Sequence, residues 1–107
     1  FLVLEIGGDI VGRVSIRHEL NEWLSTYGGH IGYAVRPEFR RKGYAKLLLG
    51  EGLKICSSLG IDHALLTCKD SNFVSAKVIE FAGGVLENIV PGPDGLLRRY
   101  WAKTNIG

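Results

Sequence analysis

The sequence lacks long apolar runs, clustered cysteines and a strong excess of either charge. No apolar run approaches the roughly 18–20 residues that a membrane-spanning helix needs, and the first residues lack the basic, apolar and small-residue pattern of a secretory signal. The two cysteines, Cys56 and Cys68, lie in apolar segments with no partner at metal-ligand spacing. We therefore expect a cytoplasmic protein without a metal. The net charge of +2 gives no general argument for a nucleic-acid or membrane partner.

What is present is the composition of an ordinary globular domain. Hydrophobic residues make up 46% and charged residues 22% of the 107 positions, which suits one domain over residues 1–107. No internal repeat, low-complexity tract or linker divides the sequence. Because Phe1 stands directly at the start of an apolar segment, we expect that further residues preceded it and that the domain is truncated at its N-terminus.

Hydrophobic patterning predicts six strands and two main helices. The strands are expected over residues 1–6, 10–16, 30–35, 64–68, 85–90 and 96–102. Apolar residues at steps of three and four predict a helix over 43–59, and a second helix over 73–82 follows a cap at Asp70, Ser71 or Asn72. A strand, a helix and a strand over 30–68 form a βαβ unit. We expect an α/β fold of α+β type, with one mixed, mostly antiparallel sheet of about six strands.

The most informative stretch, His30 to Ala45, leads from the third strand into the long helix. Pro37 keeps Arg36 extended and so ends the strand. Gly43 permits a positive φ or a close approach of the backbone to a ligand, and the helix leaves free amide donors at its N-terminus. Five of the thirteen basic residues lie within eleven positions here: Arg36, Arg40, Arg41, Lys42 and Lys46. This combination favours binding of a phosphate or pyrophosphate, the alternative being an ordinary turn with solvated basic side chains.

The stretch has neither P-loop nor dinucleotide-binding spacing, but it resembles the acetyl-CoA-binding signature of the GNAT superfamily of N-acetyltransferases. Arg40, Gly43 and Ala45 stand at the Arg-x-x-Gly-x-Ala spacing of that signature. Downstream, Asn72-x-x-Ser75 and the glycine pair after the second predicted helix resemble the corresponding helix of the family. The resemblance implies a GNAT-like fold that lacks the family's first strand and two helices.

The resemblance also implies a function and a division of labour. The protein would be an N-acetyltransferase in which a primary amine of a small molecule or peptide attacks acetyl-CoA directly, with acetyl-CoA as donor and no metal. Backbone groups around Val35 would pair with the pantetheine arm, and Asn72 with Ser75 would reach it from the second helix. The pyrophosphate would be held by residues of the loop and the first helical turn: Arg40, Arg41, Lys42, Gly43, Tyr44, Ala45 and Lys46.

The catalytic groups depart from the family pattern. Many relatives carry a tyrosine general acid on the second helix, and the register of Asn72 places Ile79 there. The chain must use another proton donor, for which Tyr33 and Tyr44 are the nearby hydroxyls, or release the thiolate unassisted. His30 is our candidate for a general base because imidazole titrates near neutral pH. The alternative for His30 is a hydrogen-bonded structural histidine.

The sequence does not identify the acceptor amine. Residues 17–29, a short helix or a loop, and the turn over 91–95 remain to shape its site. Trp23 and Tyr27 could line an acceptor slot or shield the edge of the sheet.

Three other expectations remain open at this stage. A non-catalytic acyl-CoA sensor or interaction module is the alternative function, favoured by Ile79 and by the missing N-terminal wall. A nucleic-acid site is disfavoured because the basic run lies in one loop without interleaved aromatic residues. The final strand, with Tyr100 and Trp101, is expected to be an apolar edge at which a homodimer could pair.

Overall fold

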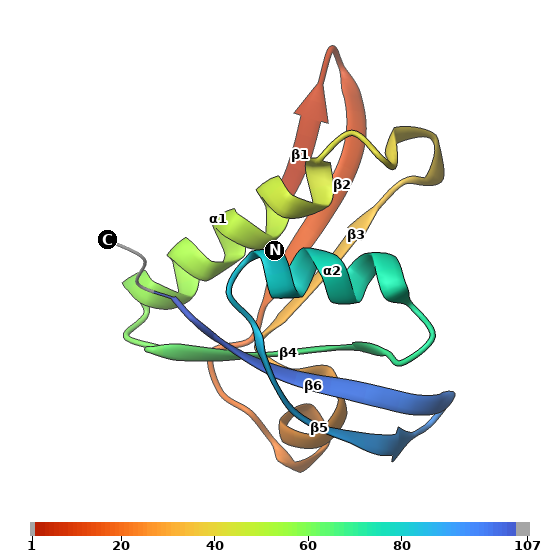
Figure 1. Cartoon of the computed structure of the whole chain (residues 1–107). Coiled ribbons are helices and arrows are strands. Elements are labelled where there is room, and N and C mark those ends of the chain that lie inside the picture. The colour runs from red at the N-terminus through yellow and green to blue at the C-terminus, as the bar shows by residue number, and fades with distance from the viewer. Residues whose placement is uncertain (1, 105–107) are drawn as a thin grey trace.

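The computed structural model describes residues 2–104 and contains the six expected strands and two main helices (Figure 1). The elements are β1 (Leu2–Ile6), β2 (Asp9–Ile16), the π-helical turn η1 (Leu24–Gly28), β3 (Ile31–Val35), the 3-10 turn η2 (Pro37–Phe39), α1 (Tyr44–Ser58), β4 (His63–Lys69), α2 (Phe73–Phe81), β5 (Val85–Gly92) and β6 (Gly95–Lys103). Phe1, which the first predicted strand included, lies outside the described residues. Among residues 2–104, neither helix has the length and apolar character needed to cross a bilayer.

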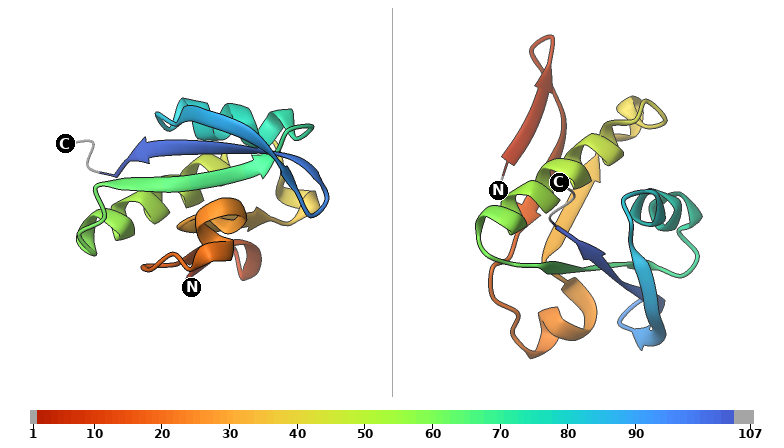
Figure 2. Two further views of the ribbon diagram at one scale, coloured as in Figure 1. Left: turned by 90° about the horizontal axis from the view of Figure 1, so that it is seen from below. Right: turned by 60° about the vertical axis from the view of Figure 1, so that its left-hand side comes forward.

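The six strands form two antiparallel sheets, ordered β1-β2-β3 and β4-β6-β5. The α+β class and the mostly antiparallel pairing are thus confirmed, but the single mixed sheet is replaced by two sheets of three strands. The connection from β3 through α1 to β4 joins these sheets instead of building a parallel pair inside one of them. Figure 2 shows that β3 and β4 are close at one end and diverge toward the other. Residues of both strands line a cavity between the sheets, and we call the space between β3 and β4 the cleft.

The two strands meet at a single point, which we call the vertex: Gly29 and His30 against Leu65. The backbone N–H of His30 donates to the Leu65 carbonyl (2.8 Å), and the Leu65 N–H donates to Nδ1 of the His30 ring (2.8 Å). A ring nitrogen takes the place of a strand carbonyl here, and the His30 carbonyl accepts from Arg17, so no ladder between β3 and β4 extends from this point. Gly29 has φ 74°, and a Cβ there would lie 2.5 Å from the Leu65 oxygen. A glycine is therefore required for the sheets to approach this closely.

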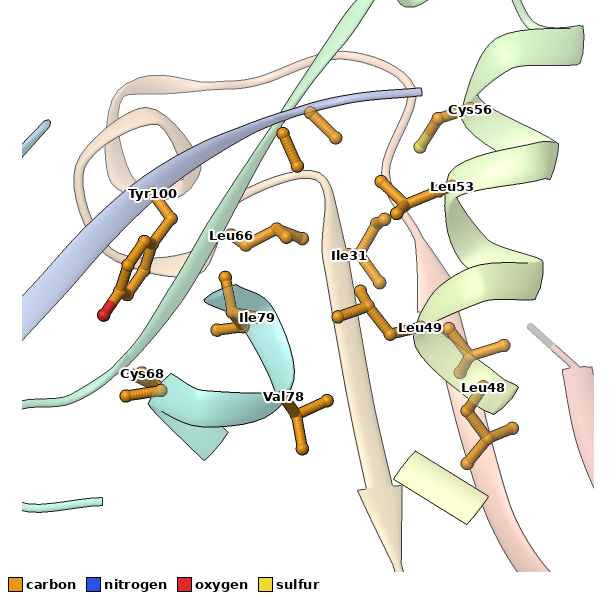
Figure 3. Close-up of a cluster of buried hydrophobic side chains, with 14 residues drawn as sticks. Ile31, Leu48, Leu49, Leu53, Cys56, Leu66, Cys68, Val78, Ile79 and Tyr100 are labelled. Carbon is orange, nitrogen blue, oxygen red and sulfur yellow. The ribbon is translucent and has the colours of Figure 1, made fainter. Parts of the chain in front are cut away.

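One hydrophobic core holds the two sheets and both helices together (Figure 3). It contains Ile31 of β3, Leu49 of α1, Leu66 of β4 and Ile79 of α2, each worth about 1.5–3 kcal/mol when fully buried. The buried positions of α1 follow the predicted three- and four-residue spacing: Leu48, Leu49, Gly52, Leu53 and Cys56. Leu59, which the same pattern placed on the buried stripe, is 42% exposed because α1 ends one residue earlier.

The last strand is not an edge of the sheet. β6 lies between β4 and β5 and pairs with both, and Tyr100 is buried at 1% exposure. The expectation that Tyr100 and Trp101 offer an edge for a homodimer is therefore wrong. The reason is topological, since the β5–β6 hairpin folds with its second strand inward against β4.

Candidate active site

The loop before α1 presents unpaired backbone amides. Gly43 caps the helix in the left-handed conformation (φ 82°, ψ 4°), as predicted, and Arg41 is also left-handed (φ 65°). No side chain caps this end of α1. Because the helix begins at Tyr44, the amides of its first turn have no carbonyl four residues earlier within the helix. Successive amides in such turns form a concavity suited to an anion, and the left-handed Arg41 is the kind of backbone strain found at ligand sites.

The basic side chains predicted to hold a phosphate surround these amides. Arg40, Arg41, Lys42 and Lys46 are all exposed. Nε of Arg40 donates to the Val35 carbonyl (3.2 Å), which ties the loop to the end of β3. Nζ of Lys46 lies 4.1 Å from the centre of the Phe81 ring of α2, so the first turn of α1 also contacts the second helix.

The edge of β3 that faces the cleft carries unpaired backbone groups. In the β2–β3 ladder, Arg36 donates to the Val11 carbonyl and Arg17 to the His30 carbonyl. Antiparallel alternation then turns the backbone groups of Ile31, Tyr33 and Val35 away from β2 and toward β4. Val35, predicted to pair with a pantetheine arm, thus stands at the correct edge, although the Arg40 side chain takes its carbonyl.

A cavity of about 290 Å³ lies between the sheets. Its lining includes three predicted site residues, Tyr33, Asn72 and Ser75. The other lining residues are Arg17, Gly28, Ile31, Gly32, Thr67 and Cys68. Residues of the loop before α1 are not part of this lining. The structure therefore brings Tyr33 together with Asn72 and Ser75 at the cavity, whereas neither His30, Val35 nor the loop is part of its lining.

Tyr33 and Ser75 connect the two walls of the cavity. The Tyr33 hydroxyl and Oγ of Ser75 are 2.9 Å apart. Asn72 caps α2, because its Oδ1 accepts from the Ser75 N–H (3.1 Å), so the amide NH₂ of Asn72 is the end left to meet a ligand. Burial raises the pKa of Tyr33 and of Cys68. At neutral pH Tyr33 therefore keeps a proton that it can donate, and Cys68 stays a thiol.

His30 and Ile79 are both buried and contribute to the packing of the fold. His30 is 8% exposed, its Nδ1 accepts the Leu65 N–H, and its ring packs edge-on against Trp101. Burial, with a smaller effect of nearby His18, lowers the pKa of His30. This geometry favours the structural alternative for His30. Ile79 is fully buried in the core, so the usual position of the general acid holds an apolar side chain.

The cavity is also lined by residues that the sequence did not single out individually. Arg17 and Gly28 line the cavity from the segment over 17–29, and Gly32 and Thr67 line it from the strands. Nothing local marks them, since the contacts that bring them together join distant positions. The Thr67 hydroxyl, for example, donates to the Tyr27 carbonyl (2.7 Å) across 40 residues.

The two aromatic residues predicted near an acceptor slot lie on another hollow. Trp23 and Tyr27 pack edge to face at 5.9 Å and help to line a hollow of about 470 Å³ beside η1. Neither lines the cavity between the sheets, and Trp23 is 55% exposed. The turn over 91–95 touches the same region, because a Cβ at Gly92 would lie 3.9 Å from the Tyr27 ring.

Comparisons with known proteins agree with this arrangement. Residues 1–83 match the model of the acetyltransferase (GNAT) family. The fold is similar to YncA of Salmonella typhimurium, solved with its cofactor acetyl-CoA (TM-score 0.77, 16% identity, 98% of this chain and 64% of that one). It is also similar to a GNAT-family acetyltransferase of Streptococcus pneumoniae (0.77, 18%, 94% and 64%) and to Ard1 of Thermoplasma volcanium (0.73, 18%, 94% and 68%). The chain thus spans about two thirds of the length of these structures.

Proposed function

The chain belongs to the GNAT family of acetyltransferases, and on this premise we propose that it transfers an acetyl group from acetyl-CoA to a primary amine. The observation that carries the proposal is the cleft between β3 and β4. An amide-rich, basic loop follows the wide end of the cleft, and a polar cavity lies between the strands. A long ligand with an anionic head and an amide-bearing arm suits these two parts.

The residues present fit acetyl-CoA. The pyrophosphate would lie on the amides that follow Arg41, with Arg40, Lys42 and Lys46 adding positive charge. The pantetheine arm would lie along the free edge of β3, whose unpaired groups can bond its amides, and Asn72 would contribute its NH₂. When bound, acetyl-CoA supplies a thioester carbonyl that an amine can attack.

Tyr33 is our candidate for the proton donor to the departing thiolate. Its hydroxyl lines the cavity, is held by Ser75 and stays protonated at neutral pH. It would replace the tyrosine that the second helix lacks at Ile79. The lining residues of the cavity include no carboxylate or histidine. We therefore propose that the amine loses its proton to water, so that turnover rises with pH as more of the amine becomes neutral.

The second candidate is an acyl-CoA-binding module that does not catalyse. Two observations favour it: Ile79 is buried, and no basic side chain of the described chain lines the cavity except Arg17, which cannot accept a proton. Such a module would hold the same ligand on the same loop. The two candidates therefore differ in turnover and not in binding.

Calorimetry and a turnover assay on the full-length protein separate these possibilities. We expect saturable binding of acetyl-CoA and release of free CoA thiol when amines are added. Binding without thiol release over a broad amine panel would favour the module. Absence of binding would overturn both candidates. 3′-Phosphoadenosine 5′-diphosphate, which keeps the pyrophosphate and lacks the pantetheine arm, is the control ligand and should bind more weakly than acetyl-CoA.

A further inference from the structure

We propose that Arg17 makes this protein select small acceptors that carry a carboxylate beside the amine, that is, free amino acids. The inference rests on the proposed function and names the class of its acceptor. It starts from the position of Arg17, which follows β2 directly, continues its ladder by donating to the His30 carbonyl (2.7 Å), and lines the cavity between the sheets.

Arg17 reaches the cavity from the side away from the helices. A Cβ on Gly52 of α1 would meet Val14, Ile16 and Ile31, so these side chains face α1. Strand alternation then places Gly32 and Arg17 on the opposite face. A Cβ at Gly32 would lie 3.1 and 3.2 Å from the two terminal nitrogens of Arg17. The missing side chain of Gly32 therefore makes room for the guanidinium across β3.

The cavity consequently has two chemically different sides. Tyr33 lies on the helix side, where its hydroxyl meets Ser75 of α2. Arg17 lies on the other side. A donor thioester near Tyr33 would leave the Arg17 side to the acceptor, so the guanidinium stands where an acceptor enters.

The Arg17 guanidinium lines the cavity without a carboxylate partner among the described residues. Arg36, Arg98 and Arg99 each form an ion pair with an Asp or Glu. Within residues 2–104, Arg17 forms none, and its side-chain hydrogen bonds are two from Nη1 to the carbonyls of residues 28–29. A guanidinium has five N–H donors, so Nε and Nη2 remain for a ligand. The described lining holds no acidic side chain, which makes Arg17 its only formal charge.

The positive charge of Arg17 determines which acceptors can enter the cavity. A simple amine, protonated in water, is repelled by the guanidinium as it enters. A carboxylate on the same molecule cancels that repulsion and can bind Arg17 through a charge-assisted, two-pronged hydrogen bond. An amino acid meets this rule. A polyamine or a lysine side chain of a protein does not, because neither has a carboxylate beside its amine.

The test compares amino acids with their carboxamides, which keep the amine and lose the negative charge. For the full-length protein we expect kcat/KM to be about 30-fold higher for the acids, from the usual worth of hydrogen bonds to charged groups. Arg17→Gln should bring this ratio close to one, and Arg17→Lys should leave an intermediate ratio. Arg13→Gln is the matched control, because Arg13 is an exposed residue of β2, the strand that Arg17 follows, and it does not line the cavity.

The ratio distinguishes substrate recognition from a structural role. Arg17 also holds the end of η1 through residues 28–29, and loss of that contact alone would lower activity toward acids and amides equally. An unchanged ratio in Arg17→Gln, or equal use of amides and acids by the unmodified protein, would overturn the role of Arg17. Should Arg17→Gln fail to fold, Arg17→Lys carries the same test. Failure to acetylate any acceptor would instead overturn the proposed function, and this inference with it.

Discussion

The two ends of the cleft are built in different ways. At the wide end, the loop before α1 is made by neighbours in sequence, with a left-handed glycine, exposed basic side chains and a bond from Arg40 to Val35. At the vertex, the Leu65 N–H bonds the His30 ring across 35 residues, and η1 is held by a bond from Arg99 of β6 to the Ser25 carbonyl across 74. A site for a large anionic ligand can be made locally, whereas the shape of the acceptor side depends on distant contacts.

The largest effect should come from Gly43→Glu at the wide end. The substitution strains a backbone with φ 82° and puts a carboxylate among amides that would hold a pyrophosphate. We expect acetyl-CoA affinity to fall about 100-fold by calorimetry. Gly60→Glu is the matched control, since Gly60 has φ 83° and open space at the other end of α1. Equal affinity in Gly43→Glu and the unmodified protein would show that the ligand does not use this loop.

At the vertex, His30→Leu should destabilise the fold by about 2 kcal/mol, because it leaves the buried Leu65 N–H without an acceptor. Urea unfolding measures this difference. His30→Asn, which can still present an acceptor, should lose less. If His30→Leu unfolded at the same urea concentration as the unmodified protein, the vertex would not depend on the ring nitrogen.

The lowered pKa of His30 predicts that the stability of the fold depends on pH. Burial holds the pKa of His30 below its ordinary 6.5, so the unfolded chain takes up a proton more readily than the folded one. The contribution of the neutral ring is fully present above about pH 6.5 and is lost as the pH falls from there through the folded-state pKa. His30→Leu should remove this part of the acid sensitivity, which urea titrations at several pH values would detect.

Tyr33 lies between the two ends of the cleft, and its substitution should have a smaller effect, mainly on kcat. We expect Tyr33→Phe to lower kcat about 10-fold. This is below the usual worth of a general acid, roughly 100-fold or more, because a thiolate can also leave without assistance. The affinity for acetyl-CoA should change less than about 2-fold because the ring remains. A loss of kcat in Tyr44→Phe with none in Tyr33→Phe would assign the proton to the other hydroxyl considered from the sequence.

The smallest effect is expected from Glu38→Gln in the turn η2. Its ion pair with Arg36 (3.3 Å) joins side chains that are 57% and 53% exposed, and such pairs contribute about 0–1 kcal/mol. Unfolding free energy should change by less than about 0.5 kcal/mol. A larger loss would show that the wide end, too, depends on specific side-chain pairing.

The sequence predictions succeeded where a feature depends on nearby residues and failed where it depends on contacts between distant residues. The position of α1 was predictable because its pattern depends on neighbours three or four residues away. The sequence offered Asp70, Ser71 or Asn72 as the cap of α2, and the structure selects Asn72. It offered a positive φ or a close approach to a ligand for Gly43, and the structure has the positive φ. The division into two sheets was not predictable from the sequence. It depends on the contact between His30 and Leu65, which are 35 residues apart and where the ring of His30 takes the place of a strand carbonyl. The place of β6 between β4 and β5 was missed for a similar reason, since a hairpin does not reveal which of its strands turns inward.

The candidate site, too, could be predicted from the sequence only in part. Tyr33, Asn72 and Ser75 were predicted and are brought to one cavity, and their roles stay predictions. Arg17 and Gly32 face one another only because of the register between β2 and β3, and one residue of slip would move every side chain to the other face. That register cannot be derived from the spacing of Arg17 and Gly32 in the sequence.

The vertex has a mechanical consequence. Since no ladder of hydrogen bonds runs between the sheets in the described chain, side-chain packing in one core fixes the angle between them. Each sheet is stiff along its ladders, so the cleft widens only by rotation of one sheet against the other about the vertex. Binding of a donor with a bulky acyl chain would thus cost free energy, because it would disturb the core packing around Ile31 and Leu66. It would not disturb the loop proposed to hold the head group. On the proposed function, the width of the cleft and the affinity for CoA would be set by separate parts of the molecule.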